Sequence, residues 1–297
     1  MTSQDTPKTL PVFGGISGLA DRYDGYILDL WGVLHNGVEP YPGVIDCLDR
    51  LRAAGKKVCL LSNAPRRCAS VTEKLSGMGI TPDHYDHLMT SGEATHEALI
   101  DPPDDWHAAL GKRCLHIGPP RDKDVFEDIG LEMVDDPADA TFVVNTGIDD
   151  FDETIADYDP ILKAGASRSL PMVCANPDLV VVVGTKMAIC AGMLAQRYEE
   201  LGGSVRYHGK PHAPVYRRCF DLLGIHDRRR IAAVGDSFRT DVAGANAAGI
   251  DAVLVTSGIH LEELATAWGE HPDPRKLAAA AAASGHIPTA AIPHFRW

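Results

Sequence analysis

The sequence predicts an α/β protein: a doubly wound parallel sheet with a second, smaller α/β domain inserted into it. Short runs of apolar and β-branched residues alternate with amphipathic helical stretches, which is the pattern of a parallel sheet covered on both faces. The chain has 297 residues, 45% of them hydrophobic, which is long enough for one large domain and one smaller domain. Two acids, a Ser-Asn pair and a lysine end strands in the two outer parts of the chain, and the middle has no such set.

The strands are predicted in order along the chain, each bounded by Gly, Ser, Asn or Asp. They are YILDL (26–30), KVCLLSN (57–63), RCLHIG (113–118), TFVVNTG (141–147), PMVCAN (171–176), IAAVGDS (231–237) and DAVLVTSG (251–258). Between the first two, Val44, Leu48 and Leu51 fall at positions i, i+4 and i+7. That spacing predicts a helix over residues 43 to 54 that stops near Gly55. We assign residues 1–87 and 206–297 to the large domain and residues 88–205 to the inserted one.

Composition excludes several classes of protein. The formal net charge of -13 and the pI of 5.4 argue against a nucleic-acid partner, whose binding needs clustered Lys and Arg. No apolar run approaches the roughly 20 residues that span a bilayer, and the first residues lack the order of a signal peptide. We therefore expect a cytoplasmic protein without a membrane partner. Its seven scattered cysteines contain no C-x-x-C pair and are expected to be reduced and mostly buried.

Polar side chains stand at four strand ends. Asp29 follows YIL, Ser62 and Asn63 follow VCLL, Lys210 follows VRYHG, and Asp236 follows IAAVG. Ligands of parallel α/β sheets bind beyond the carboxyl ends of the strands, so these groups form a candidate site. In addition, Asp241 opens the helix that follows Asp236 in GDSFRTD (235–241). Taken alone, these two acids are equally well explained as a helix-capping residue and a turn residue.

Asp29 favours a metal site over those structural roles. Two carboxylates at 4 Å repel by about 4 kcal/mol at an effective dielectric near 20, and a hard divalent cation removes that cost. Mg²⁺ is the natural occupant. With the ammonium group of Lys210 and the hydroxyl of Ser62, it would cradle a phosphoryl group. The second oxygen of Asp29 would then attack phosphorus in line.

Together these segments resemble the haloacid dehalogenase (HAD) superfamily. Asp29 with the following G-V, LLSNAP with Ser62, GKPHAP with Lys210, and GDSFRTD match its four motifs in order. TSGEAT (90–95) and CANPDLV (174–180) further resemble subfamily IIA, the NagD-like sugar-phosphate and nitrophenyl-phosphate phosphatases with a large α/β cap between the second and third motifs. The resemblance implies that residues 88–205 are this cap, and that it contributes to substrate selectivity and offers a surface for a homodimer.

The resemblance also implies a role for each residue. Asp29 would be the nucleophile that forms an aspartyl-phosphate, and Ser62 and Lys210 would hold the phosphoryl group, with Asn63 facing the same pocket. Asp236 would ligate Mg²⁺ and Asp241 would support the metal site. Lys186, in the cap segment GTKMAIC, is a candidate to contact the substrate from the cap domain.

Trp31 departs from the pattern of the superfamily. Most of its phosphatases have a second Asp at this position, which protonates the leaving oxygen and activates water, and an indole does neither. Such help is commonly worth 100- to 10,000-fold in rate. The metal site tolerates the change, because the resemblance implies that residue 31 contributes its backbone carbonyl to Mg²⁺. His35 is the nearest group able to shuttle protons near neutral pH; otherwise it is a loop histidine.

These residues support three hypotheses. The first is a Mg²⁺-dependent phosphatase acting on a small phosphorylated metabolite through an aspartyl-phosphate. The second is a phosphate-binding or regulatory protein with weak turnover, which Trp31 suggests. The third is a phosphoryl transferase to an acceptor other than water. A metal-free dehalogenase is disfavoured, because such enzymes lack the acidic G-D-x-x-x-T-D motif and their cap is inserted earlier.

Overall fold

The computed structural model describes residues 10–183 and 186–297, with the side chains of residues 182, 183 and 186 outside that description. The chain forms two compact units. The first contains residues 10–61, Leu75–Leu88 and Tyr216–Trp297, and the second contains Ser62–Lys74 and Met89–Val215. The second unit thus includes two short segments that the sequence analysis placed in the large domain. The domain boundaries of that analysis stay a prediction.

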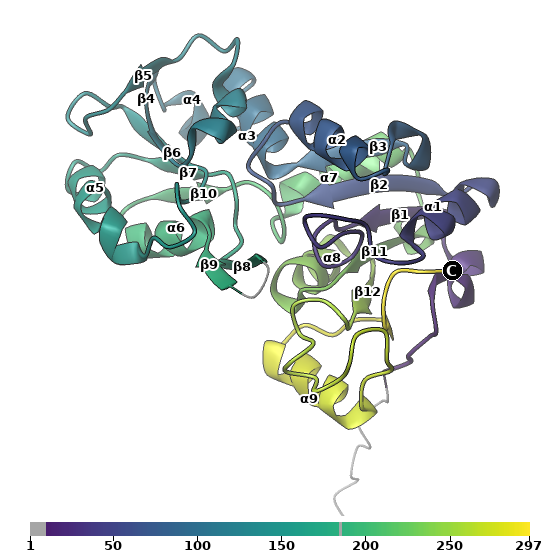
Figure 1. Ribbon diagram of the computed structural model, residues 1–297. Coiled ribbons are helices and arrows are strands. Elements are labelled where there is room, and N and C mark those ends of the chain that lie inside the picture. The colour runs from purple at the N-terminus through teal and green to yellow at the C-terminus, as the bar shows by residue number, and fades with distance from the viewer. Residues whose placement is uncertain (1–9, 184–185) are drawn as a thin grey trace, which may run out of the picture. The chain divides into compact units, whose positions relative to one another are not determined.

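The first sheet has the strand order β13-β12-β11-β1-β2-β3. Its described pairs β1–β2, β1–β11, β11–β12 and β12–β13 are all parallel. From β1 the chain runs outward through β2 and β3 and later returns to build β11, β12 and β13 on the other side (Figure 1). The order therefore reverses between β1 and β11, where sheets of this kind bind ligands. The strands are β1 (Gly25–Leu28), β2 (Lys57–Ser62), β3 (His87–Thr90), β11 (Ile231–Gly235), β12 (Asp251–Val255) and β13 (Ala290–Ile292).

Sequence periodicity explains the elements of this sheet. All four residues of β1 and all five of β11 are buried, as expected for central strands covered on both faces. The predicted first helix is α1, and its buried side chains recur at helical spacing before the left-handed Gly55 follows it. The helices that accompany this sheet in sequence are α1 (Val44–Ala53), α2 (Cys68–Gly77), α7 (Ala213–Leu223), α8 (Ala243–Ala248) and α9 (Pro274–Ser284).

The second sheet lies in the second unit and has the order β10-β7-β6-β4-β5, with every neighbouring pair parallel. Successive residues along its strands face opposite sides, so Leu115 and Val143 pack with α5 and α6, while Cys114 and Val144 pack toward α3 and α4. Its strands are β4 (Arg113–Ile117), β5 (Glu132–Val134), β6 (Phe142–Asn145), β7 (Met172–Cys174) and β10 (Val205–Tyr207). Its helices are α3 (Ser91–Ile100), α4 (Asp105–Ala108), α5 (Ile155–Ser167) and α6 (Ala191–Glu200).

The observed architecture confirms the predicted fold class. Each of the seven predicted strands is present, and the antiparallel hairpin β8 (Val180–Val183) and β9 (Lys186–Ile189) was not predicted. All seven cysteines are free, and six of them are buried, as composition predicts. Within residues 10–183 and 186–297, no helix is both long enough and apolar enough to cross a bilayer.

Candidate active site

Three carboxylates converge at the switch point of the first sheet. Asp29 directly follows β1, Asp236 directly follows β11, and Asp241 lies in the π-helical turn η6 (Phe238–Val242). One oxygen from each lies within 4.8 Å of the other two. Asp236 and Asp241 are buried and Asp29 is half-buried. The structure thus brings Asp29 together with two acids that follow it by more than two hundred positions in the sequence.

Backbone groups hold these acids in place. The N–H of Ile259 donates to Asp236 Oδ2 at 2.8 Å, and the N–H of Ser237 donates to Asp241 Oδ2 at 3.2 Å. Gly32, at φ +83°, and Gly258 approach Asp236 so closely that a Cβ on either would overlap its carboxylate. The loops after β1 and β12 can therefore close around Asp236 only because these two residues lack side chains.

The donor set fits a hard divalent cation. Three carboxylates in so small a volume repel one another, and burial of two of them removes water that would weaken the repulsion. The charge of Asp236 also reaches Tyr41, whose pKa is raised mainly by burial and further by this carboxylate. Oxygen ligands of this kind are preferred by Mg²⁺ and Ca²⁺, so the cluster has the chemistry of a site for such an ion.

Trp31 and His35 lie on the loop that follows Asp29. Their rings meet edge to face, with centroids 5.7 Å apart. The Trp31 indole lies against the backbone of Gly37, whose φ of +96° and missing side chain allow that approach. His35 is buried, and its Nδ1 accepts a hydrogen bond from the N–H of Gly37 at 3.0 Å. While this bond is formed, the proton of the neutral imidazole resides on Nε2.

A second group of predicted residues is assembled within the second unit. Ser62 ends β2, and its Oγ accepts from the N–H of Ala64 at 3.2 Å. The N–H of Lys210 donates to Asn63 Oδ1 at 2.7 Å, and Asn63 Nδ2 donates back to the carbonyl of Lys210 at 3.1 Å. Lys210, which follows β10, and Asn63 are both buried. The Asn63 side chain therefore pairs with the Lys210 backbone as a neighbouring strand would.

The motif TSGEAT holds the loop that follows Ser62, a role that sequence reasoning did not assign. Thr90 Oγ1 donates to the carbonyl of Arg66 at 2.6 Å, and Ser91 Oγ donates to that of Ala64 at 3.0 Å. Gly92 lies where a Cβ would overlap the Arg66 backbone. Each of these contacts joins segments about 25 positions apart, so neither segment alone indicates it.

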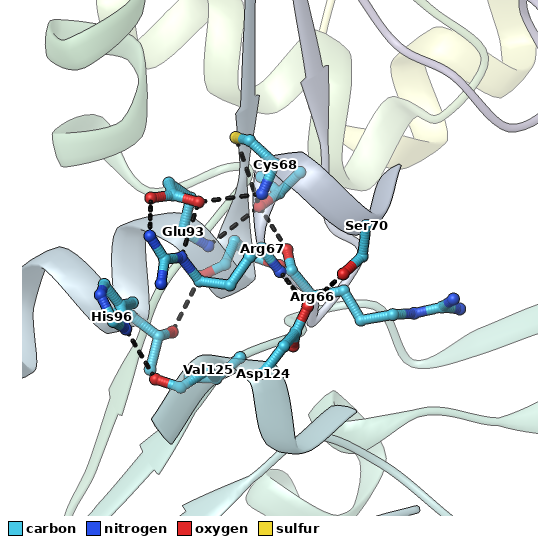
Figure 2. Close-up of polar contacts among 11 residues, drawn as sticks. Arg66, Arg67, Cys68, Ser70, Glu93, His96, Asp124 and Val125 are labelled. Carbon is cyan, nitrogen blue, oxygen red and sulfur yellow. Dashed lines mark hydrogen bonds and ion pairs between the residues drawn. The ribbon is translucent and has the colours of Figure 1, made fainter. Parts of the chain in front are cut away.

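Charged residues secure the same loop (Figure 2). Glu93 accepts from Arg67 Nε and Nη2, both at 2.9 Å, and from the N–H of Cys68 at 2.9 Å. Asp124 accepts from the N–H of Arg67 at 3.0 Å and from Ser70 Oγ at 2.6 Å. Arg67 and the backbone amide of Cys68 hold the pKa of Glu93 below its usual range despite partial burial, so it remains ionised at neutral pH.

Two histidines, His107 and His208, are in contact, and His208 stands two positions before Lys210. Asp104 Oδ1 accepts from His107 Nδ1 at 2.6 Å, and His107 Nε2 lies 3.2 Å from His208 Nε2. Burial, reinforced by the neighbouring histidines, lowers the pKa of His208 to about 4. His208 is therefore neutral at pH 7 and adds no positive charge two positions before Lys210.

Gly209 is a position where we expect any side chain to destabilise the fold. Its φ is +113°, and a Cβ would come within 2.9 Å of Ser91 Cβ and 3.0 Å of Pro177 Cδ, and would also press on Asn63 Oδ1. Gly209→Ala should lower the free energy of unfolding by about 2 to 4 kcal/mol, measured by denaturant titration. Gly202→Ala is the matched control, because Gly202 has φ +86° but nothing within 4 Å, so it should lose only about 1 kcal/mol. Equal losses in the two variants would contradict the close packing.

Lys186 is the remaining predicted residue. Its backbone begins β9, and its side chain lies outside the described part of the chain. Its contact with a substrate stays a prediction.

A doubly wound parallel sheet with buried acids at its switch point defines a class, that of the Rossmann-like α/β enzymes with a metal-type acidic site. Comparison with known proteins gives the family. Residues 26–132 match the family model of the haloacid dehalogenase-like hydrolases, and residues 207–279 match a second model described as HAD-hydrolase-like. A haloacid dehalogenase-like hydrolase from Brucella suis is 34% identical, with a TM-score of 0.80 over 95% of this chain and 99% of that one. The chain therefore belongs to the haloacid dehalogenase-like hydrolases.

Two further relatives carry more specific names. The 4-nitrophenylphosphatase of Thermotoga maritima is 25% identical, with a TM-score of 0.69 over 92% of this chain and 95% of that one. The D-glycerol 3-phosphate phosphatase of Mycobacterium tuberculosis is 28% identical over 254 residues, which are 82% of this chain and 66% of that protein. The chain thus spans just under two thirds of that relative's length. These similarities confirm the NagD-like branch that the motifs of the sequence resemble.

Proposed function

We propose that the protein is a phosphoric monoester hydrolase that uses Mg²⁺ and an aspartyl-phosphate at Asp29 to hydrolyse a small phosphorylated metabolite. The observation that carries the proposal is the convergence of Asp29, Asp236 and Asp241 within 4.8 Å at the switch point of the sheet. The phosphatase names of the relatives support the reaction class. In this proposal residues 88–205 form a cap that contributes to selectivity.

In this proposal the acids bind the metal ion, and one of them is also the nucleophile. Asp29, Asp236, Asp241 and the backbone carbonyl of Trp31 would hold Mg²⁺, which when bound neutralises negative charge on the acids and on the phosphoryl group. A carboxylate oxygen of Asp29 attacks phosphorus as the bond from phosphorus to the leaving oxygen breaks, and water then cleaves the aspartyl-phosphate.

Ser62 and Lys210 would hold the phosphoryl oxygens. Two observations support this role for them. The strands β1 and β2 run parallel with Leu28 opposite Leu60, and Asp29 follows the first while Ser62 ends the second. Asn63 directly follows Ser62, and its side chain pairs with the backbone of Lys210. The ammonium group would offset charge that grows on the phosphoryl oxygens in the transition state.

A phosphate-release assay tests this function. We expect the protein to release phosphate from at least one ester of a panel when Mg²⁺ is supplied, and to lose that activity with excess EDTA. The panel contains glycerol phosphates, sugar phosphates, pyridoxal phosphate, phosphoglycolate, nucleotides and 4-nitrophenyl phosphate. Hydrolysis is expected to favour 4-nitrophenyl phosphate, because its leaving group departs without a proton. Equal activity with and without Mg²⁺ would contradict the proposal.

Trp31 favours a second candidate, a protein that binds a phosphorylated metabolite and turns it over slowly. The indole at position 31 supplies no proton to the leaving oxygen. The protein can therefore bind a phosphate ester and hydrolyse it only slowly. Calorimetry that finds tight Mg²⁺-dependent binding of an ester from the panel, together with negligible turnover of every ester, would favour this candidate. Rapid hydrolysis of any physiological ester would exclude it.

A further inference from the structure

Asn63 lies at the centre of three hydrogen bonds in the second unit. Two of them join its side chain to the backbone of Lys210, as described above. In the third, Asn63 Nδ2 donates to Asp178 Oδ1 at 2.9 Å. Asp178 stands 115 positions after Asn63, and Lys210 stands 147 positions after it. The two N–H bonds of the amide are thus committed to protein acceptors, which leaves the side chain a positioning role toward Lys210.

Asp178 is itself held firmly. Its N–H donates to Asn176 Oδ1 at 3.0 Å, and its carbonyl accepts from the N–H of Gly192, in the first turn of α6, at 3.0 Å. Gly192 lies so close to Pro177 and Asp178 that a Cβ would overlap their backbone. The carboxylate therefore projects from a segment tied to the end of β7 and to the start of α6.

The chemistry of the three groups selects one orientation of the amide. An ionised carboxylate only accepts hydrogen bonds, so Asp178 requires the Nδ2 end of Asn63. The N–H of Lys210 only donates, so it requires the Oδ1 end. Both demands are met by the same rotamer, and the bond to the carboxylate is charge-assisted and so stronger than a neutral one. Because Asn63 is buried, water does not replace a bond that is lost.

We propose that Asp178 is a positioning residue for phosphoryl binding: through the Asn63 amide, its carboxylate holds the Lys210 backbone in register with Ser62. The inference rests on the proposed function, in which Lys210 and Ser62 hold the phosphoryl group. Asp178 belongs to the segment CANPDLV in the middle of the chain. This segment therefore supports the phosphoryl-binding residues as well as the inserted domain. A displacement of about 1 Å at such a group costs on the order of 100-fold in rate.

The test compares Asp178→Ala with Asp178→Asn. Asn keeps an oxygen that accepts from Asn63 Nδ2, whereas Ala keeps none. We expect Asp178→Ala to lower kcat/KM for 4-nitrophenyl phosphate by about 10- to 100-fold and to weaken inhibition by inorganic phosphate about 10-fold. Asp178→Asn should recover to within about 3-fold of the wild type. Asp159→Ala is the control, because Asp159 pairs with Arg197 at 2.8 Å in the same unit. It should leave both constants unchanged.

Two measurements separate the inference from the proposed function. Thermal unfolding of all variants shows whether each is folded at the assay temperature. Hydrogen exchange of the Asn63 side-chain amide, followed by NMR, reports the hydrogen bond without any substrate, and it should be at least about 10-fold faster in Asp178→Ala than in the wild type. Unchanged exchange, or unchanged kinetics in folded Asp178→Ala, would overturn the inference, as would an Asn variant as defective as Ala. Wild-type protein inactive on the whole ester panel but with slow amide exchange would instead count against the proposed function alone.

Discussion

Asp29→Asn should reduce Mg²⁺-dependent phosphate release by at least about 10,000-fold. Asn has nearly the shape of Asp, but its neutral amide neither attacks phosphorus nor carries the charge that a cation site needs. Asp29 directly follows β1 and is the least buried of the three clustered acids, so it is the one that a substrate can reach. The measurement is phosphate release from the best ester of the panel, together with trapping of labelled phosphoryl-enzyme in rapidly quenched reactions. The wild type should carry label and Asp29→Asn should not.

The matched control for this substitution is Asp135→Asn. Asp135 is exposed and belongs to the second unit, whereas the clustered acids belong to the first. It should retain wild-type activity, which would show that the loss is specific to position 29. Activity within 10-fold of the wild type in folded Asp29→Asn would remove Asp29 as the nucleophile.

Trp31→Asp should raise the turnover of an alkyl phosphate by about 100-fold or more. A carboxyl group at this position is expected to protonate the leaving oxygen and then to activate water, and general acid-base help of this kind is worth 100- to 10,000-fold. The gain should be smaller for 4-nitrophenyl phosphate, because nitrophenolate leaves without a proton. The measurement is the ratio of kcat for glycerol phosphate to kcat for 4-nitrophenyl phosphate in each protein.

Trp31→Asn separates proton transfer from packing. The indole lies against Gly37 and meets the ring of His35, so both substitutions remove the same aromatic contacts and leave a similar void. Only Asp transfers a proton. An Asp variant no faster than the Asn variant on glycerol phosphate would mean that another group, with His35 the nearest candidate, already fills this role or that position 31 does not face the leaving oxygen.

The acidic cluster was predictable because it depends on local signals. Asp29 and Asp236 each follow a short buried strand, and neighbouring parallel strands bring their carboxyl ends to one edge of a sheet. Burial patterns within four or five residues therefore suffice to expect that such acids meet. The same reasoning explains why the seven predicted strands and the first helix are present in the structure.

The partners of Asn63 were not predictable in this way. An asparagine after a strand is consistent with a turn, with a ligand contact, or with a side chain that pairs with distant backbone, and nothing in its neighbourhood distinguishes these. The outcome depends on where Lys210 and Asp178 come to lie, which the packing of α6 and of the TSGEAT segment decides. The same holds for Trp31, whose position against Gly37 depends on the path of one loop.

The sequence by itself therefore determined the fold class, through the periodicity of its strands and helices, and it determined the family and the set of acids through four motifs at or shortly after strand ends. The tertiary structure alone decided which oxygens lie within reach of one another, and that Asp178, Asn63 and Lys210 form one hydrogen-bonded chain. The physical reason is that hydrogen bonds and charge repulsion change steeply over about 1 Å. Residues more than a hundred positions apart reach that precision only through the packing of the elements that carry them.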